Sequence, residues 1–190
     1  LSKKIQPDVW FSLHDTTPRI IAKKQFVYCH HPTTFFKPTW KDWKFDYKIG
    51  VFSIFYDYLF QYNIKSNHTV FVQQHWIKNI FKERFKITNV KVTIPEFVEK
   101  ISTEKIALNE NKIHFFYPSF PKSFKNIEYI FEAIKLLPET ILNQCEFHIT
   151  GLKNNNSKYV SYLNNKYKSI EVNRLKLLNR ENMLKYYNSI

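Results

Sequence analysis

The chain has 190 residues, of which 44% are hydrophobic and 24% are charged, so it holds enough apolar material for a packed core and is not intrinsically disordered. Its 2 glycines leave no room for a glycine-rich phosphate loop, which excludes P-loop enzymes and ordinary dinucleotide-binding domains. The net charge of +13 comes from basic residues scattered along the chain, a pattern more typical of a solvated surface than of a nucleic-acid-binding block.

Short apolar runs alternate with helical patterns through the first half of the chain. Strands are predicted at residues 9–13, 26–29, 69–72 and 90–94, and helices at 48–62 and 74–85, with a loop rich in Trp and Lys before the first helix. Pro95 ends the last of these strands. This alternation is typical of a parallel sheet with helices on its faces.

The composition turns polar and charged between residues 96 and 111, where we place a linker. The pattern then restarts, with strands predicted at 113–117, 147–150 and 170–172 and helices at 126–137, 158–166 and 181–187. The predicted fold class is therefore α/β, with two Rossmann-like parallel-sheet domains at residues 1–107 and 108–190. Each is too short to be complete, both ends of the chain look cut, and residues 186–190 are expected to lead into another strand.

Cys29 and Cys145 are the only cysteines, and they lie far apart in the sequence. The chain therefore carries neither a disulfide framework nor a CxxC metal motif, and a reducing compartment fits. No apolar run approaches the roughly 20 residues of a membrane-spanning helix. We expect a cytoplasmic protein, with the inner face of the plasma membrane as a further location.

A basic turn precedes the first helix of the second half. The strand at 113–117 ends in a loop that carries Lys122 and Lys125 and enters a helix at Asn126. Free backbone N–H groups and the positive end of the helix dipole would meet the two ammonium groups there, which suits a phosphate or diphosphate. The alternative is that both lysines are solvated and Asn126 is simply the helix N-cap.

The stretch FYPSFPKSFKNIEYIFEA, at residues 116–133, resembles the start of the donor domain in family 4-type retaining glycosyltransferases, which have the GT-B fold. FHITG at 147–151 resembles the following strand of that domain, and NRENMLKYYNS at 179–189 resembles a later segment. Residues 11–32 and 70–85 are similar to the second half of the acceptor domain in bacterial polysaccharide members. In their order and spacing these segments cover nearly the whole chain.

The resemblance implies roles for particular residues. Lys125 would hold the donor diphosphate, with Lys122 as its basic partner and Asn126 beside them. Two further residues would lie next to the nucleotide base, where relatives usually have a glycine: Leu178 and Asn179. The family's paired donor-binding glutamates and its glycine-rich acceptor loop are not found in these residues, so the chain alone is expected to be inactive.

His30 matches the histidine of the family's acceptor domain and is the predicted catalytic residue. A neutral imidazole at the carboxyl end of a strand can hydrogen-bond a sugar hydroxyl, whereas the alternative is a buried structural histidine. His31 is expected to point away, because side chains alternate along a strand. His14, Asp15 and His75 could join the two neighbouring histidines as metal ligands, but the spacing of these residues in the sequence is not that of a zinc site. No metal is therefore expected.

Other polar residues at strand ends could line an acceptor cleft: His14, Asp15 and Gln73. For Asp15 we favour a cap of the turn before Pro18, and Gln73 could simply begin the next helix. The helix at 48–62 is apolar nearly all round. We favour its burial between the sheet and its neighbours, with contact to a membrane interface, aided by nearby Trp and Lys residues, as the alternative.

These features predict a retaining glycosyltransferase that moves a hexosyl unit from a nucleotide-sugar to a bacterial surface glycan or its lipid carrier. The nucleotide-sugar is the donor substrate, the chemistry is expected to be metal-independent, and no cofactor is expected. The predicted partners are the donor, the saccharide acceptor and a membrane surface, without nucleic acid. The rival hypotheses are a non-catalytic nucleotide- or carbohydrate-binding module and a basic nucleic-acid-binding protein.

Overall fold

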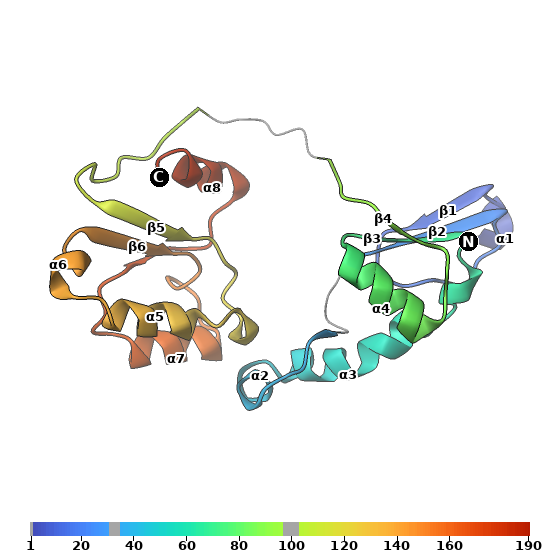
Figure 1. Ribbon diagram of the computed structural model, residues 1–190, viewed down its shortest axis with the longest axis horizontal. Coiled ribbons are helices and arrows are strands. Elements are labelled where there is room, and N and C mark those ends of the chain that lie inside the picture. Colours follow the sequence, from blue (N-terminus) through green and yellow to red (C-terminus); the bar gives the residue numbers. More distant parts are fainter. Residues whose placement is uncertain (1, 31–34, 97–102) are drawn as a thin grey trace. The chain divides into compact units, whose positions relative to one another are not determined.

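The computed structural model describes residues 2–30, 35–96 and 103–190, and the chain forms two compact units (Figure 1). The first unit comprises Leu1–Thr39 and Tyr47–Val98, and the second comprises Trp40–Asp46 and Glu99–Ile190. The sequence prediction instead places the boundary after residue 107 and assigns residues 40–46 to the first domain. Residues 40–46 belong to the second unit because they contain a short helix whose side chains pack on it.

The first unit is built on a four-stranded sheet in the order β1-β2-β3-β4, in which every neighbouring pair is parallel. The strands are β1 (Val9–Ser12), β2 (Lys24–Cys29), β3 (Thr69–Val72) and β4 (Val90–Val92). The helices of this unit are α1 (Ser2–Ile5), α3 (Tyr47–Gln61), the 3-10 turn η2 (Ile64–Ser66) and α4 (His75–Phe85).

The core of the first unit lies between one face of this sheet and the helices α3 and α4. Alternate residues of β2 and β3 enter it, and α4 adds three apolar residues spaced four apart, so each element buries one side. The buried strand residues are Val27, Cys29, Val70 and Val72, and the buried helix residues are Phe60, Ile77, Phe81 and Phe85. Burial and the nearby Asp15 carboxylate raise the pKa of the Cys29 thiol well above its usual range, so this cysteine is a packing residue.

The second unit is built on a three-stranded sheet in the order β5-β6-β7, again wholly parallel. The strands are β5 (Ile113–Tyr117), β6 (Cys145–Ile149) and β7 (Asn173–Arg174). The helices are α2 (Trp40–Phe45), the 3-10 turn η3 (Ser123–Lys125), α5 (Ile127–Lys135), α6 (Glu139–Leu142), α7 (Lys158–Lys166) and α8 (Arg180–Tyr187). Helices α5 and α7 cover one face of the sheet, and α8 lies on the other (Figure 1).

Aromatic stacking holds the helical layer of the second unit. The rings of Phe131 on α5 and Tyr167, just after α7, lie parallel with centroids 4.6 Å apart, and both residues are fully buried. The guanidinium of Arg174, the last residue of β7, lies 5.8 Å from the Phe131 ring centroid and donates to the Tyr167 carbonyl at 2.8 Å. One cation therefore ties the sheet edge to this stack.

The predicted fold class is confirmed: both units are α/β, and both sheets are parallel and Rossmann-like. The strand predicted at 170–172 is wrong, because Ile170 donates its backbone N–H to Tyr167 in the turn that ends α7, and β7 begins only at Asn173. The helix predicted at 181–187 is confirmed as α8, which begins one residue earlier and ends at Tyr187 in a turn.

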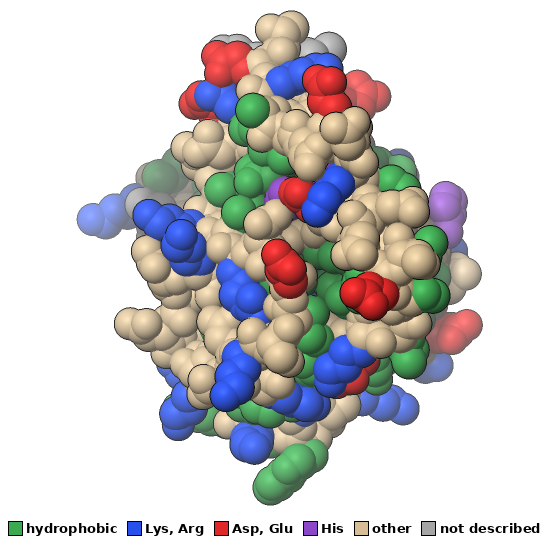
Figure 2. Space-filling view, turned by 90° about the vertical axis from the view of Figure 1, so that its left-hand side faces the viewer, with side chains coloured by type: hydrophobic (Ala, Val, Ile, Leu, Met, Phe, Trp, Pro, Cys, Tyr) green, Lys and Arg blue, Asp and Glu red, His purple; other side chains and the backbone are tan. Residues whose placement is uncertain are grey.

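The favoured prediction for the helix at 48–62, burial between the sheet and its neighbours, is also wrong. Its buried residues are Gly50, Ser53 and Phe60, whereas most of its large apolar side chains are exposed. None of the helices in the described ranges has the length and apolar character needed to cross a bilayer. Lys and Arg are spread over the face of the molecule drawn in Figure 2, with Asp and Glu among them.

A glycine at the end of β6 presses against the loop that follows β5. Gly151 has a φ of +76°, and a Cβ added there would lie 2.4 Å from Pro121 Cδ and 3.1 Å from Leu177 Cδ2. Both the left-handed backbone and the close approach therefore require glycine.

Gly151→Ala is expected to lower the free energy of unfolding of the second unit by about 2–4 kcal/mol, since strain and overlap add. Urea denaturation followed by circular dichroism measures it. The matched control is Asn154→Gly, which replaces a residue at a φ of 56° by one that adopts it freely and should change stability by less than about 1 kcal/mol. Wild-type stability in Gly151→Ala would contradict the close packing of this loop.

Candidate functional site

A histidine and an aspartate meet at the carboxyl edge of the first unit's sheet. Asp15 follows β1 and His30 follows β2, and the two parallel strands end at the same edge. The Asp15 carboxylate accepts the backbone N–H of His30 at 2.6 Å and lies 3.3 Å from the Nδ1 atom of its ring. The Asp15 side chain is 5% exposed and that of His30 is 44% exposed, so a buried acid supports an accessible imidazole.

The backbone around Asp15 is pinned to β2. Asp15 adopts a φ of 60°, its N–H donates to the Tyr28 carbonyl at 3.3 Å, and its own carbonyl accepts from the Cys29 thiol at 3.5 Å. The Tyr28 ring stacks on that of His30 at 6.0 Å between centroids. The carboxylate thus reaches across to the loop after β2, a pairing that the sequence did not predict.

This pairing has a consequence for the imidazole. A carboxylate beside Nδ1 favours the tautomer with its proton on that nitrogen. The His30 side chain is partly exposed, so a ligand at this edge of the sheet could reach the ring. The arrangement therefore suits binding and orientation of a polyhydroxylated molecule at this edge.

The other polar residues predicted at this edge do not join the pair through any contact among the described residues. His14 is exposed, and Gln73 is half-buried after β3. The neighbouring Gln74 accepts from the Trp76 indole N–H at the start of α4. His31 lies outside the described residues.

In the second unit the basic turn already contacts two carboxylates, one in α2 and one directly after it. Lys122 donates to Asp46 at 2.6 Å, and the Ser123 hydroxyl donates to Asp42 at the same distance. Asp42 and Ser123 are both buried, so their hydrogen bond holds α2 against η3. An anion at this turn would have to share or displace the Asp46 carboxylate to reach Lys122.

Lys125 and Asn126 complete the turn. Lys125 is exposed, its ammonium lies 5.6 Å from the Phe124 ring centroid, and no carboxylate of the described residues pairs with it. Asn126 precedes α5 with a φ of 51°, and its side chain makes no capping hydrogen bond but accepts from Lys41 at 2.7 Å. Lys125 is thus the cation of the turn most available to a phosphate.

The first turn of α5 carries its own acid. Glu128 pairs with Lys41 at 3.2 Å and accepts from the Tyr159 phenol at 2.5 Å. Burial, with a further effect of this carboxylate, raises the pKa of Tyr159 well above its usual range, so the phenol stays a donor. The Glu128 carboxylate therefore already neutralises part of the positive potential at the N-terminus of α5, which would otherwise attract an anionic ligand.

The two residues predicted beside a nucleotide base lie before α8. Asn179 is the N-cap of that helix, since its side chain accepts the Asn182 N–H at 2.9 Å, and Leu178 is half-buried. Glu181 in the first turn of α8 forms an ion pair with Lys185 at 2.9 Å. The cap accounts for Asn179 without a ligand.

Comparison with protein-family models finds no match, and comparison with curated proteins finds none either. Among solved structures, the chain is similar to one described as "Crystal Structure of TarM", with 16% sequence identity and a TM-score of 0.48. The match covers 92% of this chain and 36% of the TarM chain, so this chain spans about a third of the length of TarM. So distant a likeness carries no activity from one protein to the other.

Sequence reasoning missed two groups of polar residues in the second unit. The acidic residues Asp42 and Asp46 lie in a segment read as a loop, where alternating Lys and Asp between aromatic residues is the one local signal of their pairing. His114, Glu146 and His148 occupy alternate positions on the paired strands β5 and β6. Their period of two predicts a shared face, but only the strand register shows that they meet.

Proposed function

We propose that the chain is part of a retaining glycosyltransferase of the GT-B, family 4-type kind. It would move a hexosyl unit from a nucleotide-sugar to a bacterial surface glycan or a lipid-linked saccharide. The observation that carries this proposal is the contact of His30 with the buried Asp15 at the carboxyl edge of a parallel sheet. Open α/β sheets bind their ligands at that edge.

In this proposal the two units have separate tasks. His30 Nε2 accepts a hydrogen bond from a sugar hydroxyl and orients the sugar, while Asp15 fixes the ring. Lys125 and the N-terminus of α5 stabilise the diphosphate charge that develops as the sugar leaves. Lys122 contributes once its ammonium is shared between Asp46 and the phosphate. No residue in this scheme needs a metal ion.

The resemblance of the segments at 116–133, 147–151 and 179–189 to donor domains supports the second task. The structure adds that β5 leads through η3 directly into α5, so the chain supplies a strand, a basic turn and a helix N-terminus in that order. The carboxylates of Asp42 and Asp46 weaken the attraction of this turn for a phosphate, so the affinity for the nucleotide-sugar is the decisive measurement.

The test is binding of UDP- and GDP-sugars to the chain by calorimetry at two salt concentrations. We expect one nucleotide-sugar to bind with an affinity that changes little with salt, since few charges are exchanged. Absence of binding to every UDP- and GDP-sugar tested would refute the proposal. Oligonucleotide binding that falls steeply with log salt would favour a nucleic-acid-binding protein instead.

We further propose that α3 contacts an anionic membrane surface, as a lipid-linked acceptor would require. Its outward face repeats at helical spacing and is 41–68% exposed, with Val51, Phe52, Phe55, Tyr58 and Leu59. Tyr62, directly after the helix, is exposed as well. The inward face carries the small residues Gly50 and Ser53, so the helix is more apolar toward solvent than toward its own unit over its first turns. Its one acid, Asp57, pairs with Arg84, which leaves the outward face without a carboxylate to repel lipid phosphates.

A further inference from the structure

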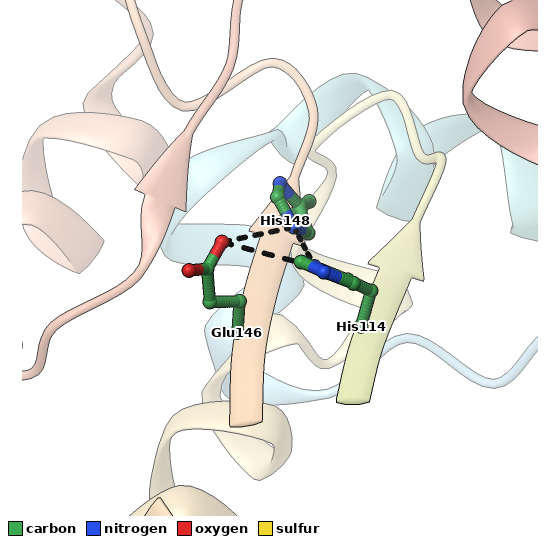
Figure 3. Close-up of side chains that lie close together, drawn as sticks. All are labelled: His114, Glu146 and His148. Carbon is green, nitrogen blue, oxygen red and sulfur yellow. Dashed lines mark hydrogen bonds and ion pairs between the residues drawn. The ribbon is translucent and has the colours of Figure 1, made fainter. Parts of the chain in front are cut away.

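Three ligating side chains gather on one face of the second unit's sheet. His114 comes from β5, and Glu146 and His148 come from β6, where His114 is the register partner of Glu146. Side chains two residues apart on a strand share a face, so His148 lies on the same side as Glu146. Figure 3 shows the three side chains converging between the two strands.

The ligand atoms already lie close to metal-binding distances from one another. His114 Nδ1 is 3.0 Å from His148 Nε2, and Glu146 Oε2 is 3.7 Å and 3.8 Å from these two nitrogens. A four-coordinate zinc ion with bonds of about 2.0–2.1 Å separates its ligand atoms by about 3.3 Å. Movements of a few tenths of an ångström would therefore bring all three atoms into the coordination shell of one ion.

Neighbouring groups orient the ligands. His114 Nε2 lies 2.9 Å from the Asn109 carbonyl, which can only accept, so Nε2 carries the proton and the lone pair of Nδ1 faces the cluster. On Glu146, Lys112 lies 3.7 Å from Oε1, while Oε2 faces the histidines and accepts a long hydrogen bond from Asn173 at 3.5 Å. A hydrogen bond from histidine to a backbone carbonyl is the usual support of a metal ligand.

The three-residue cluster can be reached through a cavity and is bounded on one side by an aromatic ring. His148 is 4% exposed, its ring meets that of Tyr186 at 5.7 Å, and its Nδ1 has no hydrogen-bond partner in the described part of the chain. A cavity of about 470 Å³ adjoins the cluster and is lined in part by Asn109, Glu146, His148 and Tyr186. An ion could enter there and keep a water as a further ligand.

We propose that His114, Glu146 and His148 bind a divalent transition-metal ion such as Zn²⁺. Imidazole nitrogens favour Zn²⁺ and its neighbours in the periodic table over Mg²⁺ and Ca²⁺. The ion would tie β5 to β6 and, through Asn109, to the segment before β5, so its role is structural. The sequence led us to expect no metal, and this site takes no part in the proposed sugar transfer.

The alternative explanation is a hydrogen bond between two neutral imidazoles, with Glu146 nearby. The chelator-treated 190-residue chain is therefore titrated with Zn²⁺ by calorimetry and with Co²⁺ by visible absorption. We expect one equivalent of either ion, a Co²⁺ ligand-field band, and a rise in Tm of roughly 5 °C or more at Zn²⁺ concentrations 100-fold above Kd. Mg²⁺ at the same concentration should leave Tm unchanged.

His148→Gln and Glu146→Gln are each expected to weaken Zn²⁺ binding at least 10-fold. The matched control is His75→Gln, an exposed histidine of the first unit, which should bind like wild type. If His148→Gln fails to fold, the test rests on Glu146→Gln, which keeps the shape of the side chain. Absence of stoichiometric binding to wild type, or wild-type affinity in the folded cluster variants, would overturn the site and leave the paired imidazoles as the explanation.

Discussion

Lys125→Ala is expected to weaken binding of a nucleoside diphosphate to this chain by roughly 10- to 100-fold, the usual effect of losing one charge-assisted hydrogen bond. Lys125 stands at the turn into α5, is exposed, and has no carboxylate partner among the described residues. Isothermal titration with UDP and GDP measures the change. Lys135→Ala is the matched control, because that lysine ends the same helix and pairs with Glu132.

The acid that follows α2, Asp46, allows a second test in which binding should become stronger. Asp46→Asn removes the carboxylate that holds Lys122 and should strengthen diphosphate binding several-fold, whereas Lys122→Ala should weaken it. Unchanged affinity in Lys125→Ala would remove that residue from the site. Weaker binding in Asp46→Asn would mean that the ion pair serves to position the turn.

The strands were predictable because their burial follows a local pattern. Thr69–Val72 and Ile113–Tyr117 have the predicted bounds, and so does α7, Lys158–Lys166. The short helix α2 was not predictable from its own residues, because its Asp42 is held by Ser123, which lies 81 positions away. A helix of 6 residues depends on such tertiary contacts, since its own hydrogen bonds do not offset its nucleation cost.

The candidate site was likewise predictable only in part from the sequence. Position at a strand end pointed to both Asp15 and His30, because parallel strands end at one edge. Their contact depends on the left-handed backbone of Asp15 and on the register of β1 and β2, neither of which leaves a trace in composition. The two lysines of the basic turn could be found in the sequence. The net charge of the turn could not, because Asp42 and Asp46 reach it from a segment that is distant in the sequence.

Helix α3 gives the other large expected effect. The chain should co-sediment with vesicles of phosphatidylglycerol and phosphatidylcholine, and replacing Phe52, Phe55 and Tyr58 by Ser should lower the partition coefficient at least 10-fold. Each ring carries apolar area from water into the lipid interface, where aromatic residues are favoured. These side chains are exposed in the structure, so the variant should fold normally.

The matched control replaces three exposed apolar residues of the second unit, Tyr129, Leu136 and Ile141, by Ser and should bind vesicles like wild type. Raising the salt concentration separates the two contributions, because it screens the attraction of basic residues to anionic lipid but not the apolar transfer. Binding that vanishes in high salt and is unaffected by the α3 substitutions would show that charge alone holds the chain to lipid. Concentration-dependent self-association without vesicle binding would instead assign the α3 face to a second copy of the chain.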